Sequence, residues 1–222
     1  MSHINQTIAS LDSLGLEMSL LKHPFYQQWT AGQLSPDRLR NYAIQYYPHV
    51  AAFPRYLSAL HSRCDDLSDR QVLLENLIDE ERGAENHPAL WLEFAEALGV
   101  TRDQLLEAAT LPAARALVDT FDHLSRDLPL PSGLSALYVY ETQVAQVATA
   151  KIDGLRRFYG FSDNAIADHA KFFEVHRSAD PYHAQALAQL IERYDLGTQE
   201  SAPALDAART ALNAIWDLLD CF

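Results

Sequence analysis

The chain has 222 residues, a formal net charge of −13 and two cysteines, Cys64 and Cys221. Its 17 lysines and arginines against 30 aspartates and glutamates supply no basic surface for phosphate, so we expect no nucleic-acid partner. A chain of this length can bury a full core without disulfides, and neither cysteine has metal-ligand spacing, so both are predicted to be reduced thiols in the cytoplasm.

Leucine and alanine dominate, glycine is rare, and no β-branched run alternates as a strand would, which predicts an all-α protein. No apolar stretch approaches the roughly 18–20 residues of a membrane helix, and the N-terminal residues do not resemble a signal peptide. Ser35 before Pro36 predicts a helix start, as does the capping box of Thr101 and Gln104. The expected helices cover residues 4–20, 36–63, 67–83, 87–98, 102–109, 112–127, 132–159, 163–178, 181–195 and 202–220.

Residues 128–132 form the one proline-rich break in the chain. We interpret this break as a loop rather than a domain boundary, because the candidate metal ligands described below fall on both sides of it. The sequence is therefore expected to form one domain, residues 1–222.

The first group of candidate ligands is His176, Asp180 and His183. On one α-helix they lie at about 0°, 40° and −20°, so they share a face whose length of about 10 Å suits two ions rather than one. The alternative is that Asp180 caps a new helix that begins at Pro181, which would remove His176 from that face. The residues alone leave both possibilities open.

Two further candidates are Glu80 and His87, which lie seven residues apart. They share a face if the helix continues through Gly83. The competing interpretation is that Glu80 belongs to an ordinary solvated acidic surface with its neighbours Asp79 and Glu81.

Glu141 is the one charged side chain between residues 128 and 150. A carboxylate on so apolar a helix costs several kcal/mol unless it is paired, protonated or bound to metal, although a hydrogen bond would also satisfy it. The six candidates supply three carboxylates and three imidazoles, a set that suits iron or manganese. They resemble the ligands of helical di-iron proteins without their Glu-x-x-His spacing.

Aromatic residues are concentrated near the expected helix that starts at Pro36. Core packing is one interpretation of this cluster, and a redox-active or substrate-lining surface near the metals is the other. Lys151 follows the apolar stretch of the helix that carries Glu141. The simpler interpretation of this residue is a lysine whose amine extends to solvent. The aromatic residues are Phe25, Tyr26, Trp29, Tyr42, Tyr46, Tyr47 and Phe53.

Several long strings of residues resemble the family of the Chlamydia protein associating with death domains, which are heme-oxygenase-like di-metal oxidases. The resemblance covers nearly the whole chain, and strings of this length are more specific than any single motif. It is carried by residues 23–29, 46–49, 52–66, 79–81, 86–87, 138–141, 151–155 and 176–183.

This resemblance implies a seven-helix, heme-oxygenase-like bundle that forms a homodimer. It implies that Glu80, His87, Glu141, His176, Asp180 and His183 bind two iron-class ions, Fe/Fe or Fe/Mn. It further implies a 4-aminobenzoate synthase for folate biosynthesis that uses O₂ and an external reductant. Tyr26 would supply the ring and Lys151 the nitrogen, so each chain would act once.

Two features of the sequence do not fit the site that the resemblance implies in a simple way. On a straight helix Lys151 lies about 15 Å along the axis from Glu141 and about 80° around it, which requires a bend or a sideways approach. Pro181 also departs from the family pattern beside Asp180.

Three alternatives stay open. The same scaffold could oxidise a separate small molecule, or it could be a metal-free relative of pyrroloquinoline-quinone synthase or thiaminase II. It could also be a helical interaction protein, but no docking motif is evident, so a death-domain partner is not expected.

Overall fold

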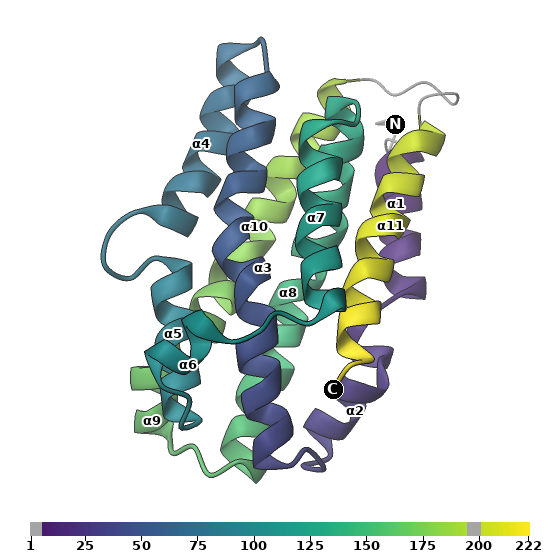
Figure 1. Cartoon of the computed structure of the whole chain (residues 1–222). Helices are drawn as coiled ribbons and strands as arrows, with labels where there is room; N and C mark the ends of the chain where they lie inside the picture. Colours follow the sequence, from purple (N-terminus) through teal and green to yellow (C-terminus); the bar gives the residue numbers. More distant parts are fainter. Residues whose placement is uncertain (1–5, 195–200) are drawn as a thin grey trace.

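A computed structural model describes residues 6–194 and 201–222, with only the backbone of residues 178–181. These residues form eleven α-helices, one short 3-10 helix and no strand, which confirms the all-α prediction (Figure 1). The helices exceed the seven implied above because short helices flank the long ones. They are α1 (Gln6–Glu17), η1 (Leu20–Lys22), α2 (Pro24–Thr30), α3 (Pro36–Arg63), α4 (Leu67–Glu81), α5 (His87–Ala97), α6 (Arg102–Glu107), α7 (Pro112–Arg126), α8 (Leu130–Phe158), α9 (Asp163–His169), α10 (Lys171–Arg193) and α11 (Ser201–Leu219).

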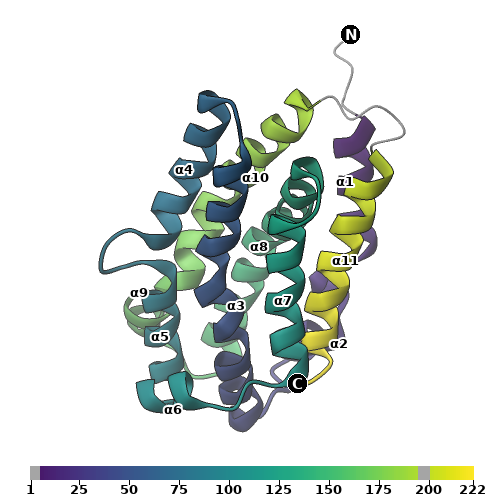
Figure 2. The ribbon, with the colours of Figure 1, turned by 45° about the horizontal axis from the view of Figure 1, so that its top comes forward.

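Helix α8 lies in the middle of the bundle. It packs along α10 and α11, while α3 packs along α7 and α4 (Figures 1 and 2). Most side chains of α8 are buried, as its apolar sequence predicts. The buried residues of α8 include the polar or charged side chains of Glu141, Gln143 and Lys151. None of the helices in the described part of the chain combines the length and apolar character needed to cross a membrane. That one domain spans residues 1–222 stays a prediction.

The predicted helix ends are confirmed where capping residues mark them. The Ser35 hydroxyl accepts a hydrogen bond from the N–H of Arg38 at 3.3 Å, and α3 begins at Pro36. Thr101 and Gln104 form both hydrogen bonds of a capping box at the start of α6. Helix α3 continues unbroken through its two internal prolines.

Helix α10 differs from the prediction. The sequence was expected to end one helix at residue 178 and begin another at Pro181, but α10 runs from Lys171 to Arg193. The chain turns instead at Ala170, between α9 and α10. A proline inside a helix costs about 3 kcal/mol. Here the buried residues on both sides of Pro181, including His176 and Leu187, hold the helix in place.

Helix α2 was not predicted. Its first position is Pro24, and its N-cap is His23, whose Nδ1 accepts a hydrogen bond from the N–H of Phe25 at 3.1 Å. Histidine is not among the usual N-cap residues, which is why the start of this helix was not predicted from the sequence.

Helix α2 lies tightly against α8. The indole of Trp29 donates a hydrogen bond to the carbonyl oxygen of Lys151 at 3.2 Å. Gly154 leaves the room for this contact, since a Cβ at that position would lie 2.5 Å from the indole ring. The contact brings α2, and with it Tyr26, against the part of α8 that carries Lys151.

Candidate metal centre

Five of the six predicted ligands meet inside the bundle, although they come from four helices. Their side chains are all buried, with exposed fractions between 1% and 6%. The sixth, Asp180, has a side chain outside the described part of the structure, so its role stays a prediction. The five are Glu80 on α4, His87 at the start of α5, Glu141 on α8, and His176 and His183 on α10.

Glu80 belongs to two groups of possible ligand atoms. One group is Glu80, His87 and His176, and the other is Glu80, Glu141 and His183. Within each group the ligand atoms lie within 4.8 Å of one another. Two groups that share one carboxylate suit a site for two metal ions. Glu80 would then supply a ligand to both ion positions.

Glu80 and His87 do not meet on one helix face. Helix α4 ends at Glu81, and the chain turns through Gly83, whose φ of +86° is favourable only for glycine, before α5 begins at His87. The two side chains still come together, with Nδ1 of His87 at 2.5 Å from Oε2 of Glu80. The sequence analysis therefore predicted the correct pair of residues from an incorrect geometry. The two residues meet because a loop joins α4 to α5, and not because they lie on one continuous helix.

The hydrogen bonds of two histidines leave one ring nitrogen of each available to a metal. Nδ1 of His176 donates to the backbone oxygen of Phe172 at 2.6 Å, which leaves the lone pair on Nε2. Nε2 of His183 lies 3.2 Å from Oδ2 of Asp79, and its buried Nδ1 has no hydrogen-bond partner among the described residues. Burial lowers the pKa of His176 well below its usual value, so this ring is neutral, as a metal ligand must be.

The donor set fits iron or manganese. Glu80, His87 and His176 supply the two imidazoles and one carboxylate that are common at non-heme iron sites. A cavity of about 10 Å³ lies beside them, with room for about one water-sized molecule. It is lined by Val50, Phe53, Glu80, Tyr140, Glu141, Phe172 and His176.

A second buried site surrounds the amine of Lys151. Nζ donates a hydrogen bond to the hydroxyl of Tyr42 at 2.5 Å, and no carboxylate is paired with it in the described structure. Burial lowers the pKa of Lys151 to about 7, so a large part of the amine is neutral near neutral pH. We call this site the aromatic chamber, formed by the rings that lie 4.8–5.6 Å from Nζ: Tyr26, Tyr42, Tyr46, Trp91 and Phe173.

Tyr26 is enclosed in this chamber. Its side chain is 2% exposed, and the centroid of its ring lies 5.5 Å from Nζ of Lys151. The ring of Tyr42, whose hydroxyl accepts from Lys151, belongs to the same chamber. Burial raises the pKa of Tyr26, so the phenol keeps its proton at neutral pH.

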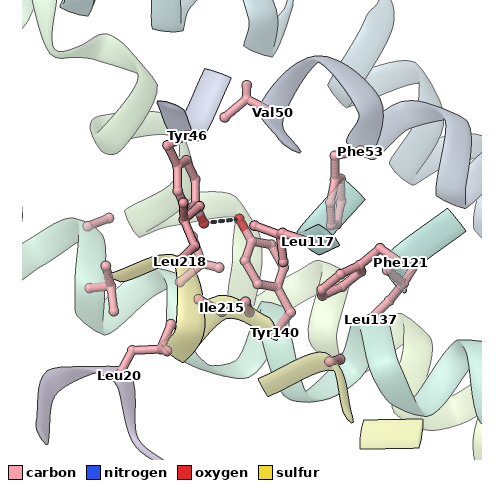
Figure 3. Packing of buried hydrophobic residues seen from close by; sticks show 14 of the residues in the cluster. Leu20, Tyr46, Val50, Phe53, Leu117, Phe121, Leu137, Tyr140, Ile215 and Leu218 are labelled. Atoms are coloured by element: carbon pink, nitrogen blue, oxygen red, sulfur yellow. Dashed lines mark hydrogen bonds between the residues drawn. The ribbon is translucent and has the colours of Figure 1, made fainter. Parts of the chain in front are cut away.

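Aromatic contacts connect the chamber with the candidate metal centre. Trp91 stacks on Tyr46 at a centroid distance of 5.3 Å, and Phe172 contacts both Trp91 at 4.9 Å and the ligand His176 at 4.1 Å. A second link is the hydrogen bond of 3.1 Å between the hydroxyls of Tyr46 and Tyr140 (Figure 3). Tyr140 precedes Glu141 and lines the small cavity.

Comparison with known proteins shows the family of the chain. The family model described as iron-containing redox enzyme matches residues 40–216. The chain belongs to this family. The match also supports the heme-oxygenase-like fold that the sequence implied.

Two relatives of this redox enzyme are named 4-aminobenzoate synthase. The protein of Nitrosomonas europaea is 44% identical, over 95% of this chain and 88% of the relative. That of Chlamydia muridarum is 43% identical, over 96% of this chain and 88% of the relative. These matches confirm the resemblance that the sequence indicated. Because the relatives are enzymes, they give no support to a death-domain partner.

The fold itself is shared more widely. The structure of a TenA homolog from Pseudomonas syringae pv. tomato matches with a TM-score of 0.79, covering 97% of this chain and 90% of that chain. At 21% sequence identity this likeness concerns the fold alone. The family match and the close relatives together support an oxidoreductase with a metal cofactor.

Sequence reasoning missed several residues of this redox enzyme that adjoin the predicted ones. Trp91 lies four residues after His87 on α5, and Phe172 lies four residues before His176 on α10. Residues four apart share a helix face, so this spacing was a usable signal. The hydrogen bond from Lys151 to Tyr42 had no such signal, because it joins α8 to α3 across the interior.

Proposed function

We propose that this protein is a 4-aminobenzoate synthase that makes its product from its own Tyr26, with Lys151 as the nitrogen donor. The observation that carries the proposal is the position of the Lys151 amine, 5.5 Å from the centroid of the Tyr26 ring inside the closed aromatic chamber. The cavity beside the candidate metal centre measures about 10 Å³ and would not admit a separate aromatic substrate. An internal ring is therefore the better candidate.

The atoms of a tyrosine side chain match the product. The ring and Cβ together supply the seven carbons of 4-aminobenzoate. The bond between Cα and Cβ must break, and Cβ must be oxidised to the carboxylate with O₂ as the oxidant. At the opposite ring position Nζ of Lys151 must form a bond to the ring carbon, the hydroxyl oxygen must leave as water, and the bond between Nζ and Cε of Lys151 must break. Tyr26 would then be consumed, so each chain would act once.

Lys151 and Tyr42 prepare the nitrogen donor. Only a neutral amine has the lone pair needed to form a bond to carbon, and burial keeps much of Lys151 in this form. The hydroxyl of Tyr42 accepts one N–H of the amine and so holds the amine beside the ring of Tyr26. The surrounding rings exclude water, which would compete for the same carbon.

The metal ligands proposed for this function are the six residues of the sequence prediction: Glu80, His87, Glu141, His176, Asp180 and His183. They would hold two iron-class ions, Fe/Fe or Fe/Mn, which when bound supply the reduction of O₂ with electrons from an external reductant. Tyr26 lies apart from these ligands. The rings of Trp91 and Phe172 connect the two places, because Trp91 lies beside the amine of Lys151 and Phe172 contacts both Trp91 and His176.

The remaining parts of the proposal come from the sequence. The family resemblance implies a role of the product in folate biosynthesis and a homodimer. The two cysteines favour a cytoplasmic location, and the candidate ligands on both sides of residues 128–132 favour a single domain. The rival functions differ in what they require. A separate small substrate would have to be added for product to form, and a metal-free relative of pyrroloquinoline-quinone synthase or thiaminase II would bind no stoichiometric iron or manganese.

The proposal is tested by incubating the purified full-length chain with ferrous iron, a reductant and air, without any organic substrate. We expect 4-aminobenzoate to form and to stop at no more than one equivalent per chain, because Tyr26 is consumed. Mass spectrometry of the released small molecules measures the yield. Continued formation beyond one equivalent would rule out a ring taken from the chain, and no product despite oxygen uptake would indicate a separate substrate.

A further inference from the structure

Asp79 contacts one of the candidate ligands without belonging to either ligand group. Its Oδ2 lies 3.2 Å from Nε2 of His183, and the contact joins α4 to α10. The side chain of His183 is 1% exposed, while that of Asp79 is 58% exposed. The carboxylate therefore approaches the buried ring from the solvent side.

This contact fixes the proton on the imidazole. An ionised carboxylate can only accept, so Nε2 of His183 must carry the hydrogen and donate it. A ring that ligates a metal must be neutral, so its lone pair is then on Nδ1, which is buried and has no hydrogen-bond partner among the described residues. His183 is also grouped with Glu80 and Glu141 as a possible ligand.

We propose that Asp79 is a positioning residue that sets the tautomer and orientation of His183, so that Nδ1 serves the metal position of Glu80 and Glu141. A partner carboxylate of this kind raises the basicity of the ligating nitrogen and holds the ring in place. The inference rests on the proposed metal centre but not on the chemistry of 4-aminobenzoate.

The other two histidines are oriented differently. His176 donates to a carbonyl of its own helix, the backbone oxygen of Phe172, and His87 contacts the candidate ligand Glu80. The orientation of His183 alone depends, within the described structure, on a side chain from another helix that is not itself a candidate ligand. Consecutive residues of α4 thus have distinct roles. Glu80 supplies a ligand, and Asp79 orients a ligand on α10.

The test compares Asp79→Ala and Asp79→Asn with Glu81→Ala, which removes a charge from an exposed position on the same helix turn. Each full-length protein is titrated with Mn²⁺ without oxygen. We expect two ions in the wild type, and in Asp79→Ala a loss of about 10–100-fold in affinity for one ion and little change for the other. Asp79→Asn should recover part of the loss, because its amide oxygen still accepts from Nε2, and Glu81→Ala should bind as the wild type does.

A second readout needs no metal. Nitrogen NMR of the His183 ring in protein without added metal should show the hydrogen on Nε2 in the wild type and a mixture of tautomers in Asp79→Ala. If Asp79→Ala does not fold, the metal titration and the nitrogen NMR spectrum of Asp79→Asn test the inference instead. The inference is overturned if Asp79→Ala binds both ions within about threefold of the wild type, or if its His183 keeps the hydrogen on Nε2. A wild type that binds fewer than two ions would instead count against the proposed centre, and the tautomer would still test Asp79.

Discussion

Replacing Tyr26 with phenylalanine should lower the yield of 4-aminobenzoate by about 100-fold or more while both metal ions stay bound. Phenylalanine keeps the ring and the shape of the chamber but lacks the oxygen that nitrogen must replace. It also lacks the phenol that makes tyrosine easy to oxidise. The released product is measured by mass spectrometry after aerobic incubation with ferrous iron and a reductant, and the bound metal is measured in the same samples.

Tyr138→Phe is the matched control for this substitution. Tyr138 also lies on a buried helix, but its hydroxyl donates to Asp12 of α1 and it takes no part in the chamber. We expect this variant to form product at the wild-type yield. Undiminished product from Tyr26→Phe would show that another ring is consumed, with Tyr42 and Tyr46 of the same chamber as the next candidates.

Glu80→Ala should remove both metal ions, weakening each by about 100-fold or more, and should abolish product formation. Glu80 is the residue common to both groups of ligand atoms, so each ion would lose one of its three described protein ligands. By contrast, Glu141→Ala should weaken mainly the ion of the second group. Metal content after reconstitution and gel filtration measures both effects.

The control for Glu80→Ala is Glu81→Ala, which removes an exposed carboxylate from the next position of α4. It should leave the metal content unchanged. If Glu80→Ala keeps one ion at the wild-type affinity, Glu80 does not serve both positions, and the two ligand groups are not parts of one centre.

Much of the fold follows from local sequence signals. Ser35 with Pro36, and Thr101 with Gln104, mark helix starts that the structure reproduces, because caps act over only a few residues. Local signals also caused the error at Pro181. A proline after a capping residue favours a new helix, and only the burial of α10 on both sides of this position outweighs that preference.

The candidate site was less accessible to sequence reasoning. Glu141 stands out because a lone carboxylate in an apolar helix needs a partner, and this argument does not depend on the fold. The sequence around Asp79 and Tyr42 gives no comparable indication of a functional role, because each residue contacts a side chain of another helix.

Lys151 illustrates the remaining difficulty. Its distance from Glu141 along α8 was expected to require a bend in the helix or a sideways approach of the lysine, whereas in the structure the lysine extends into a chamber of its own, beside Tyr26. No bend is required, because the amine and the candidate metal ligands belong to two neighbouring sites joined by aromatic rings.

The origin of the product carbons tests the central claim most directly. Protein produced with tyrosine labelled by ¹³C in the ring and at Cβ would be incubated with unlabelled reductant, ferrous iron and air. We predict 4-aminobenzoate in which all seven carbons are labelled, including the carboxylate carbon that Cβ supplies, together with the loss of the side chain from the peptide that contains Tyr26. Unlabelled product, or product accompanied by an intact Tyr26, would contradict the account.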